Sequence, residues 1–243
     1  MEQLIEMKQM YKIYGEGESQ VRALDGVDLT IGRGEMAAIV GQSGSGKSTL
    51  MNMVGCLDIP TKGEYYLEGT NVASLSDEAL SQIRNREIGF VFQGFNLIPS
   101  LNALENVELP LLYRGMKSEE RRRLAKEALE RVGLSNRMTH RPAQMSGGQQ
   151  QRVAIARAIA ARPPIILADE PTGNLDSRSG SEVIDILREL WQEGRTVILI
   201  THDSAIAALA GRQIHIVDGK ICEDVRISEN SSKGYRKTTR QLV

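Results

Sequence analysis

The residues with the clearest chemical spacing are the glycines and the lysine of segment 41–48, Gly-Gln-Ser-Gly-Ser-Gly-Lys-Ser. Glycines let backbone N–H groups approach an anion, and a helix start adds partial positive charge. The spacing matches the P-loop, whose lysine reaches the β- and γ-phosphates and whose hydroxyl ligates Mg²⁺. An ordinary Gly/Ser turn would not need the apolar run at 36–40 and the helix expected at 47–54. We therefore expect ATP to contact Gly41, Gln42, Ser43, Gly44, Ser45, Gly46, Lys47, Ser48 and Thr49.

Two acids end a second apolar run, at residues 165–168. An apolar strand places its terminal carboxylates at the carboxyl edge of a parallel sheet, where ligands bind. There Asp169 suits the Mg²⁺ shell and Glu170 suits activation of the attacking water. The alternative is a strand that simply ends in a charged turn. The P-loop upstream favours the functional interpretation.

Apolar runs and amphipathic stretches alternate in the last hundred residues. Runs at 165–168, 197–200 and 214–217 follow or precede helices expected at 149–161 and 179–193. Strands that alternate with helices indicate a parallel sheet with helices on its faces. The fold class is therefore α/β.

The rest of the chain is expected to differ from this pattern. Residues 3–31 are typical of short strands broken by glycines. The middle is predicted to be helical. Ser76 marks the start of a helix at 77–84, and Ser118 marks the start of another at 119–132. Pro99 and Pro110 bracket a further short helix at 103–109. We expect one ATP-binding core at 1–94 and 146–230, a helical insertion at 95–145, and a polar tail at 231–243 that is disordered.

The string Ser146-Gly147-Gly148-Gln149 after Met145 resembles the signature motif of ABC-type ATPases. The family's other motifs are present in its order: the P-loop, Gln93 in Phe-Gln-Gly-Phe-Asn-Leu, Asp169-Glu170, Asn174-Leu175-Asp176 and His202 in Thr-His-Asp. The resemblance covers about residues 3–222. It implies a P-loop core of the RecA-like type, with an N-terminal antiparallel β-subdomain and an inserted α-helical subdomain. Met145 departs from the usual leucine, a swap that roughly conserves volume.

The resemblance also implies roles for residues that spacing alone leaves open. In the family, Ser146, Gly147, Gly148 and Gln149 of one copy close over ATP held by the P-loop of a second copy. Asp176 would contact the partner's P-loop, so a head-to-tail homodimer with two ATPs is expected. The catalytic set would be Glu170, His202 and Gln93, and the metal set Ser48, Gln93 and Asp169. Tyr14 resembles the aromatic that stacks on adenine, with Tyr11 as the alternative.

Several strings resemble the macrolide-exporter and lipoprotein-release branch, the MacB/LolD type: Phe-Asn-Leu-Ile-Pro, Glu-Asn-Val-Glu-Leu-Pro and Ala-Asp-Glu-Pro-Thr-Gly-Asn-Leu-Asp. This implies a separate ATPase subunit that drives a permease of the MacB/FtsX type in export or extraction. FtsE-type ATPases are close relatives, so a mechanical regulator that moves no solute is the alternative. The transported substrate is left open.

Composition excludes other classes of function. The net charge of −1 and the aromatic content of 4% do not favour binding to nucleic acid, which usually needs basic or base-stacking surfaces. Cys56 and Cys222 form no disulfide framework or metal spacing, which favours a reducing compartment. The longest charge-free stretch, 88–104, is too polar to span a bilayer, and no leader segment is recognised. We expect a cytoplasmic protein held at the inner face of the membrane by its permease; lipid attraction of the basic tail is less favoured than a solvated end.

Overall fold

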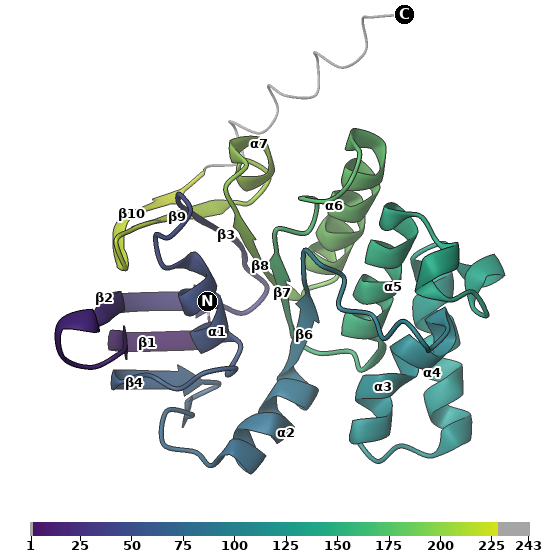
Figure 1. Cartoon of the computed structure of the whole chain (residues 1–243), viewed down its shortest axis with the longest axis horizontal. Coiled ribbons are helices and arrows are strands. Elements are labelled where there is room, and N and C mark those ends of the chain that lie inside the picture. Colours follow the sequence, from purple (N-terminus) through teal and green to yellow (C-terminus); the bar gives the residue numbers. More distant parts are fainter. Residues whose placement is uncertain (1, 228–243) are drawn as a thin grey trace, which may run out of the picture.

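Residues 2–227 are described by a computed structural model of the chain. Ten strands form two sheets (Figure 1). The antiparallel sheet has the order β2-β1-β4-β5, with bounds Val21–Gly32, Gln3–Tyr14, Lys62–Leu67 and Thr70–Asn71. The main sheet has the order β10-β9-β3-β8-β7-β6, with bounds Lys220–Arg226, Arg212–Val217, Met36–Val40, Thr196–Thr201, Ile165–Asp169 and Ile88–Val91. The expected α/β fold with an antiparallel β-subdomain is confirmed.

The main sheet is parallel from β9 to β6, while β10 runs antiparallel at one edge. A two-residue turn, Asp218-Gly219, joins β9 to β10, and a loop that short connects only antiparallel strands. The N-terminal segment also differs from the expected short strands. It forms two strands of 12 residues each, whose pairing is interrupted by bulges.

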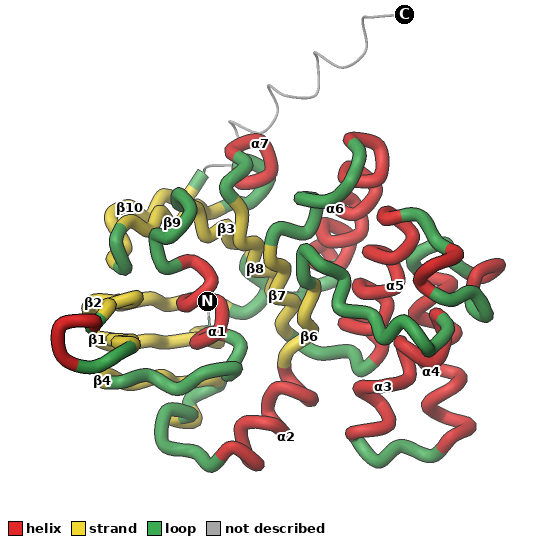
Figure 2. Tube along the Cα trace, viewed as in Figure 1, coloured by secondary structure: helices red, strands yellow, loops and turns green. Residues whose placement is uncertain are grey.

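Seven α-helices are described, drawn in red in Figure 2: Lys47–Val54 (α1), Asp77–Glu87 (α2), Ala103–Tyr113 (α3), Ser118–Arg131 (α4), Gly147–Ala160 (α5), Ser177–Gln192 (α6) and Ser204–Ala207 (α7). Short 3-10 turns occupy Gly17–Ser19, Ser135–Arg137 and Pro142–Gln144. In the described part of the chain, no helix has the length and apolar character that crossing a membrane requires.

Each face of the main sheet has its own core, because side chains alternate along a strand. In β8, Ile198 and Ile200 join the cluster that includes α1 and the antiparallel sheet. Val197 and Leu199 point the other way, into the cluster built with α3 to α6. Figure 1 shows the same division, with α1 and β1 on one side of the main sheet and α5 and α6 on the other. The sheet therefore separates two packed layers.

Two predicted helix boundaries were wrong. Ser118 is the first helical residue of α4 rather than its cap; Lys117 takes the cap position, and no side chain caps the helix. Pro110 lies inside α3 instead of ending it. Proline removes one helical N–H, but Asn85 on α2 donates to the Pro110 carbonyl at 2.9 Å and also accepts from Arg114 at 3.1 Å. These contacts tie the last turn of α3 to α2.

Residues 95–145, which we continue to propose as the helical insertion, contain α3 and α4, and both helices pack against α5. The expected tail at 231–243 lies outside the described residues.

Candidate functional site

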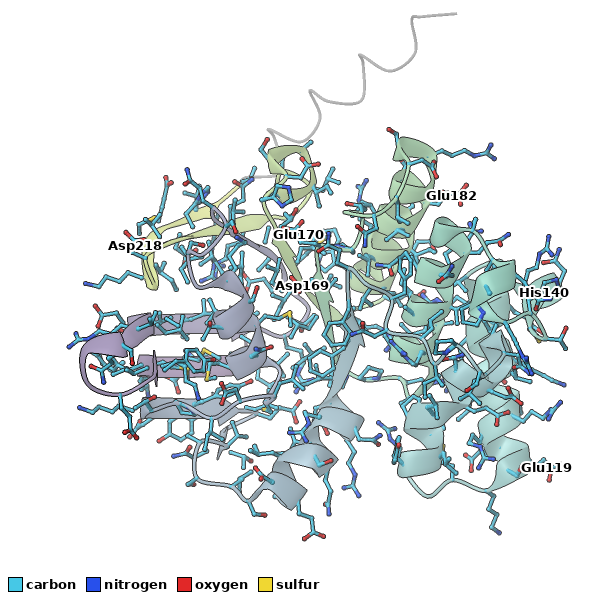
Figure 3. The ribbon with its side chains drawn as sticks, viewed as in Figure 1. Glu119, His140, Asp169, Glu170, Glu182 and Asp218 are labelled. Atoms are coloured by element: carbon cyan, nitrogen blue, oxygen red, sulfur yellow. The ribbon has the colours of Figure 1, made fainter. Side chains whose placement is uncertain are left out.

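Four parallel strands end at one edge of the main sheet, and predicted site residues follow each of them. The P-loop follows β3, and His202 follows β8 directly. Glu170 follows β7, and Gln93 stands two residues beyond the end of β6. The carboxyl ends of parallel strands are where α/β sheets bind ligands. In Figure 3, Asp169 and Glu170 lie at this edge.

The P-loop is folded around its lysine. Lys47 is buried, and its ammonium donates to the carbonyl oxygens of Gly41 at 2.8 Å and Gln42 at 2.7 Å. Gly46 has a φ of 103°, and a Cβ there would lie 2.6 Å from the Ala23 carbonyl oxygen. A Cβ on Gly41 would lie only 2.4 Å from the carbonyl oxygen of residue 216. The loop therefore requires glycine at both positions.

A pocket of about 350 Å³ opens beside this loop. Besides P-loop residues, it is lined by segments that the sequence did not indicate: Val21, Arg22 and Ala23 of β2, and Asp218 and Gly219 of the β9–β10 turn. The turn is tied to the loop, because the Gly219 N–H donates to the Ser45 carbonyl at 2.9 Å. An Asp-Gly pair signals a hairpin, but nothing in the sequence signals that this hairpin reaches the P-loop.

Asp169 lies close enough to the P-loop lysine to be influenced by its charge. Burial raises the pKa of the Asp169 carboxyl, the neighbouring Glu170 raises it further, and Lys47 lowers it. A half-buried carboxylate and a buried lysine thus lie near one another beyond the ends of β7 and β3, which are separated by β8. The structure brings the two predicted motifs together.

Glu170 is held by the end of β8. Its Oε1 accepts from the His202 backbone N–H at 3.0 Å and lies 2.6 Å from Nδ1 of the His202 ring. Its Oε2 accepts from the Thr201 hydroxyl at 3.2 Å. The φ of Glu170 is 43°, in the left-handed region that non-glycine residues rarely occupy. Strained backbone of this kind gathers at functional sites, where the surrounding structure holds it.

Gln93 meets the loop that follows Glu170. A Cβ on Gly173 would lie 2.7 Å from the Gln93 side-chain nitrogen, so the two residues are in contact. The Asn174 side-chain amide donates to the Gln93 carbonyl at 3.0 Å. Gln93 itself is exposed. The predicted glutamine and glutamate therefore share one loop neighbourhood.

Ser146 begins α5 and caps it. Its hydroxyl accepts from the Gln149 N–H at 3.3 Å, while the Gln149 side chain accepts from the Ser146 N–H at 3.0 Å. This reciprocal capping box leaves the other N–H groups at the helix start available to an anion. Gly148 packs on α6, since a Cβ there would lie 2.6 Å from the Ser179 hydroxyl oxygen.

Asp176 caps the neighbouring helix, α6. Its carboxylate accepts from the backbone N–H groups of Ser179 at 3.0 Å and Arg178 at 3.1 Å. These hydrogen bonds, that of Ser179 first, lower the pKa of the Asp176 carboxyl. The residue is exposed.

The signature segment and the P-loop do not share a site within one chain. Helix α1, which follows the P-loop, packs on β2, β7 and β8. Helix α5, which follows Ser146, packs on α3, α4, α6 and β6. Figure 1 shows the two helices on different sides of the main sheet. Each therefore offers half of the arrangement expected around a nucleotide.

Tyr14 lies beside the helix that follows the P-loop. Its hydroxyl donates to Asp58 at 2.9 Å, and the Lys12 ammonium sits 5.0 Å from its ring centre. Burial, followed by the hydrogen bond to Asp58, raises the pKa of the Tyr14 phenol, and the nearby Thr49 side chain lowers it. The residue as a whole is 41% exposed, so part of its side chain is accessible to a ligand.

Comparisons with known proteins show the family to which this chain belongs. The sequence profile of the ABC transporter family matches residues 24–173. A MacB macrolide export ATP-binding/permease protein of Hyphomonas neptunium is 55% identical over 221 residues, which cover 91% of this chain and 34% of that protein. The pyoverdine export protein PvdT of Pseudomonas fluorescens is 56% identical, covering 94% of this chain and 35% of that protein. The chain thus spans about a third of the length of these two relatives.

Other relatives match along nearly their whole length. An uncharacterized ABC transporter ATP-binding protein of Thermotoga maritima is 52% identical, over 91% of this chain and 94% of that protein. Among solved structures, the ATP-binding cassette MJ0796, described as a dimer bound to ADP and Pi after hydrolysis, matches with a TM-score of 0.86. It is 48% identical and covers 92% of this chain and 99% of that one.

The fold and the strand-end site define a nucleotide-binding domain of the P-loop class. The family profile and the relatives narrow this class further: the chain belongs to the ABC transporter family, and its enzymatic chemistry is that of an ABC ATPase.

Proposed function

We propose that this chain hydrolyses ATP as the energy-coupling cassette of a MacB-type exporter, and that two copies clamp two ATP molecules head to tail. The observation that carries this proposal is the separation of the P-loop and the signature segment onto different sides of one sheet. A C₂ pair brings each P-loop to the other copy's α5, so that both sites become equivalent. The dimeric state named for the related cassette supports the proposal.

Within each proposed site the residues divide the chemistry. Lys47 offsets charge on the β- and γ-phosphates, and the capped start of α5 from the partner copy donates N–H groups to the γ-phosphate. Glu170, already hydrogen-bonded to the end of β8, accepts a proton from the attacking water. His202 contacts Glu170, and Gln93 lies against Gly173 in the loop that follows it; these two residues orient the water and the γ-phosphate.

The donor groups at this edge fit a Mg²⁺ ion. Ser48 exposes a hydroxyl beside the pocket, Asp169 offers a half-buried carboxylate near Lys47, and Gln93 offers an amide oxygen. Oxygen ligands of this kind, few in number and completed by phosphates, are what Mg²⁺ prefers. When bound, the ion neutralises charge on the phosphate oxygens.

A permease partner is the remaining part of the proposal. The MacB and PvdT relatives are named as combined ATP-binding and permease proteins. A groove of about 790 Å³ between α2, β6, α3 and α5 is rimmed by exposed Leu57 and Tyr113. We place the permease segment in this groove, which would hold the cassette at the inner face of the cell membrane. Export is favoured over a mechanical role by the names of these relatives.

The permease part can be tested in vesicles that contain a MacB-type permease. Tyr113 is 81% exposed at the groove, so Tyr113→Asp should abolish permease-stimulated ATPase activity while leaving the activity of the isolated chain unchanged. Val225→Asp, on the exposed edge strand β10, is the matched control and should leave the stimulation intact. Full stimulation of the Tyr113 variant would exclude this groove.

The ATPase part is tested by Glu170→Gln. This variant should bind ATP, lose turnover by at least about 100-fold, since general-base catalysis contributes roughly 10²–10⁴, and accumulate as a dimer with ATP. Light scattering after size exclusion measures the dimer. Lys47→Ala is the control that should remain monomeric because it lacks the phosphate contact. If Glu170→Gln stays monomeric with bound ATP, the shared-site proposal is wrong.

A further inference from the structure

The loop that carries Gln93 has an unusual backbone. Phe95 has a φ of 61° and Asn96 a φ of 50°, so two consecutive residues other than glycine stand in the left-handed region. Asparagine tolerates this conformation, whereas a bulky phenylalanine rarely adopts it. Such a pair persists only where neighbouring groups hold it in place.

An arginine of α5 provides that hold. Arg157 donates from Nη2 to the Phe95 carbonyl oxygen at 2.9 Å and from Nη1 to the Asn96 carbonyl oxygen at 2.5 Å. A guanidinium presents its donors in a rigid planar fork, so it fixes both carbonyl directions at once. On the other side of the loop, Asn174 donates to the Gln93 carbonyl.

The bonding of Arg157 differs from that of the other arginines near it on α5. Arg152 pairs with Glu182, and Arg162, just past the helix end, pairs with Glu127. Within residues 2–227, Arg157 forms no ion pair with a carboxylate. Burial of its guanidinium lowers the pKa of that group. In the described part of the chain, this half-buried cation is hydrogen-bonded to two carbonyls of one loop, which holds the guanidinium and the loop together.

The start of α5 touches the same loop. A Cβ on Gly147 would lie 3.7 Å from the tip of the Phe95 ring, one residue after Ser146. The loop therefore lies beside the start of α5 near the signature segment and is hydrogen-bonded to the same helix by Arg157, ten residues later.

We infer that Arg157 is a positioning residue that sets Gln93 through the carbonyls of Phe95 and Asn96, and so links the signature helix to the catalytic edge. The inference rests on the proposed role of Gln93 in hydrolysis. Arg157 also lines the groove that we assign to the permease. Arg157 therefore belongs to α5, lines that groove and is hydrogen-bonded to the loop that carries Gln93.

The test compares Arg157→Met and Arg157→Lys in the full chain, with Arg162→Met as the matched arginine control. Arg157→Met should lower kcat for ATP roughly 10- to 100-fold, the loss expected for hydrogen bonds to a charged group, while the Kd for ATP changes less than about twofold. Arg157→Lys, which retains the charge but not the fork, should also lower kcat. Arg162→Met should match the wild type in both quantities.

Two further measurements separate positioning from a purely structural role. Added to Gln93→Ala, Arg157→Lys should cause little further loss, because both changes disable the same group. Asn96→Gly should restore part of the kcat of Arg157→Lys, because glycine adopts the left-handed conformation without support. If Arg157 had only a structural role, the losses of kcat from Arg157→Lys and Gln93→Ala would multiply in the double variant. The melting temperature of Arg157→Lys would also fall.

Unchanged kcat in folded Arg157→Met, or multiplicative losses with Gln93→Ala, would overturn the inference. If Arg157→Met does not fold, Arg157→Lys and its Asn96→Gly combination decide the question alone. Glu170→Gln is measured in parallel. If that variant hydrolyses ATP normally, the proposed function itself fails; if it is inactive while Arg157 variants are fully active, only the positioning role is wrong.

Discussion

Tyr14 and Tyr11 lie three residues apart on β1 and meet different surroundings. The Tyr14 hydroxyl reaches Asp58, near the end of α1. The Tyr11 hydroxyl packs on β2, where a Cβ on Gly26 would lie only 2.9 Å from it. An odd separation directs two side chains to opposite faces of a strand. The surroundings favour Tyr14 as the residue that stacks on adenine.

We predict that Tyr14→Ala raises the Kd for ATP about 10-fold, because base stacking on an aromatic ring contributes roughly 1–3 kcal/mol. Tyr14→Phe retains the ring and should stay within about threefold of the wild type. Tyr11→Ala should leave the Kd unchanged and lower only the melting temperature. Calorimetric titration with ATP and Mg²⁺ distinguishes the variants, and a larger effect at Tyr11 would reverse the assignment.

At the scale of elements, Arg212 on β9 joins three strands. It donates to Asp224 on β10 at 2.7 and 2.6 Å, to Glu35 before β3 at 3.1 Å, and to the Thr30 carbonyl on β2 at 2.8 Å. Its side chain is only 5% exposed and that of Glu35 only 8%. Both sheets are therefore tied beside the hairpin that lines the pocket next to the P-loop.

We expect Arg212→Met to lower the free energy of unfolding by about 3 kcal/mol, because it strands the buried Glu35 carboxylate without its partner. Arg226 lies 3.7 Å from the same glutamate, but its side chain is largely exposed. Arg226→Met should therefore lower the free energy of unfolding by less than about 1 kcal/mol. Urea unfolding of both variants measures the difference. Equal losses would contradict the buried tie.

The same network predicts a dependence of stability on pH. The hydrogen bond from Arg212 holds the pKa of Asp224 below its usual value. A lowered carboxyl pKa adds stability above the unfolded value of about 3.9, and this stability is lost as pH falls through the folded pKa. Asp224→Asn should therefore destabilise the protein at pH 7 and show a smaller drop in stability below about pH 4. If the free energy of unfolding of Asp224→Asn, measured in urea, fell with acid as steeply as that of the wild type, the proposed contribution of Asp224 would be wrong.

At the scale of the whole molecule, the main sheet separates the P-loop side from the α5 side. Neither side contains a complete site in the proposed arrangement. One P-loop and the signature segment of the other copy make each site. Two inactive variants with defects on different sides should therefore complement one another.

We predict that Lys47→Ala and Ser146→Arg are each inactive alone, and that their equimolar mixture regains ATPase activity. In the mixed dimer one site carries both defects and the other carries neither. Lys47→Ala mixed with Glu170→Gln, two defects on the same side, is the control that should stay inactive. A steady-state phosphate-release assay is sufficient. Absence of recovery in dimers verified by light scattering would rule out complementary sites.

Much of the site could be predicted because its chemistry is local. The spacing of Gly41 to Ser48 is visible in eight residues, and Lys47 closes the loop on the nearby Gly41 and Gln42 carbonyls, although the close approach of residues 216 and 23 to the glycines is not visible there. Helix ends were harder: the prediction that Pro110 stops α3 was wrong, since the helix continues to Tyr113 and Leu111 in its last turn is buried in the core, a contact that the local sequence does not show. Asp218 and Gly219 could not be assigned to the pocket, since their contact with Ser45 spans most of the chain.

The sequence by itself determined which groups are available for chemistry: a phosphate loop, two acids after an apolar strand, and a helix start after Ser146. These features depend on residue type and near neighbours. Only the tertiary structure decided that Glu170 meets His202, that Arg157 holds the loop of Gln93, and that Ser146 lies across the sheet from Lys47. Strand order and packing set those distances, and both arise from contacts far apart in the chain.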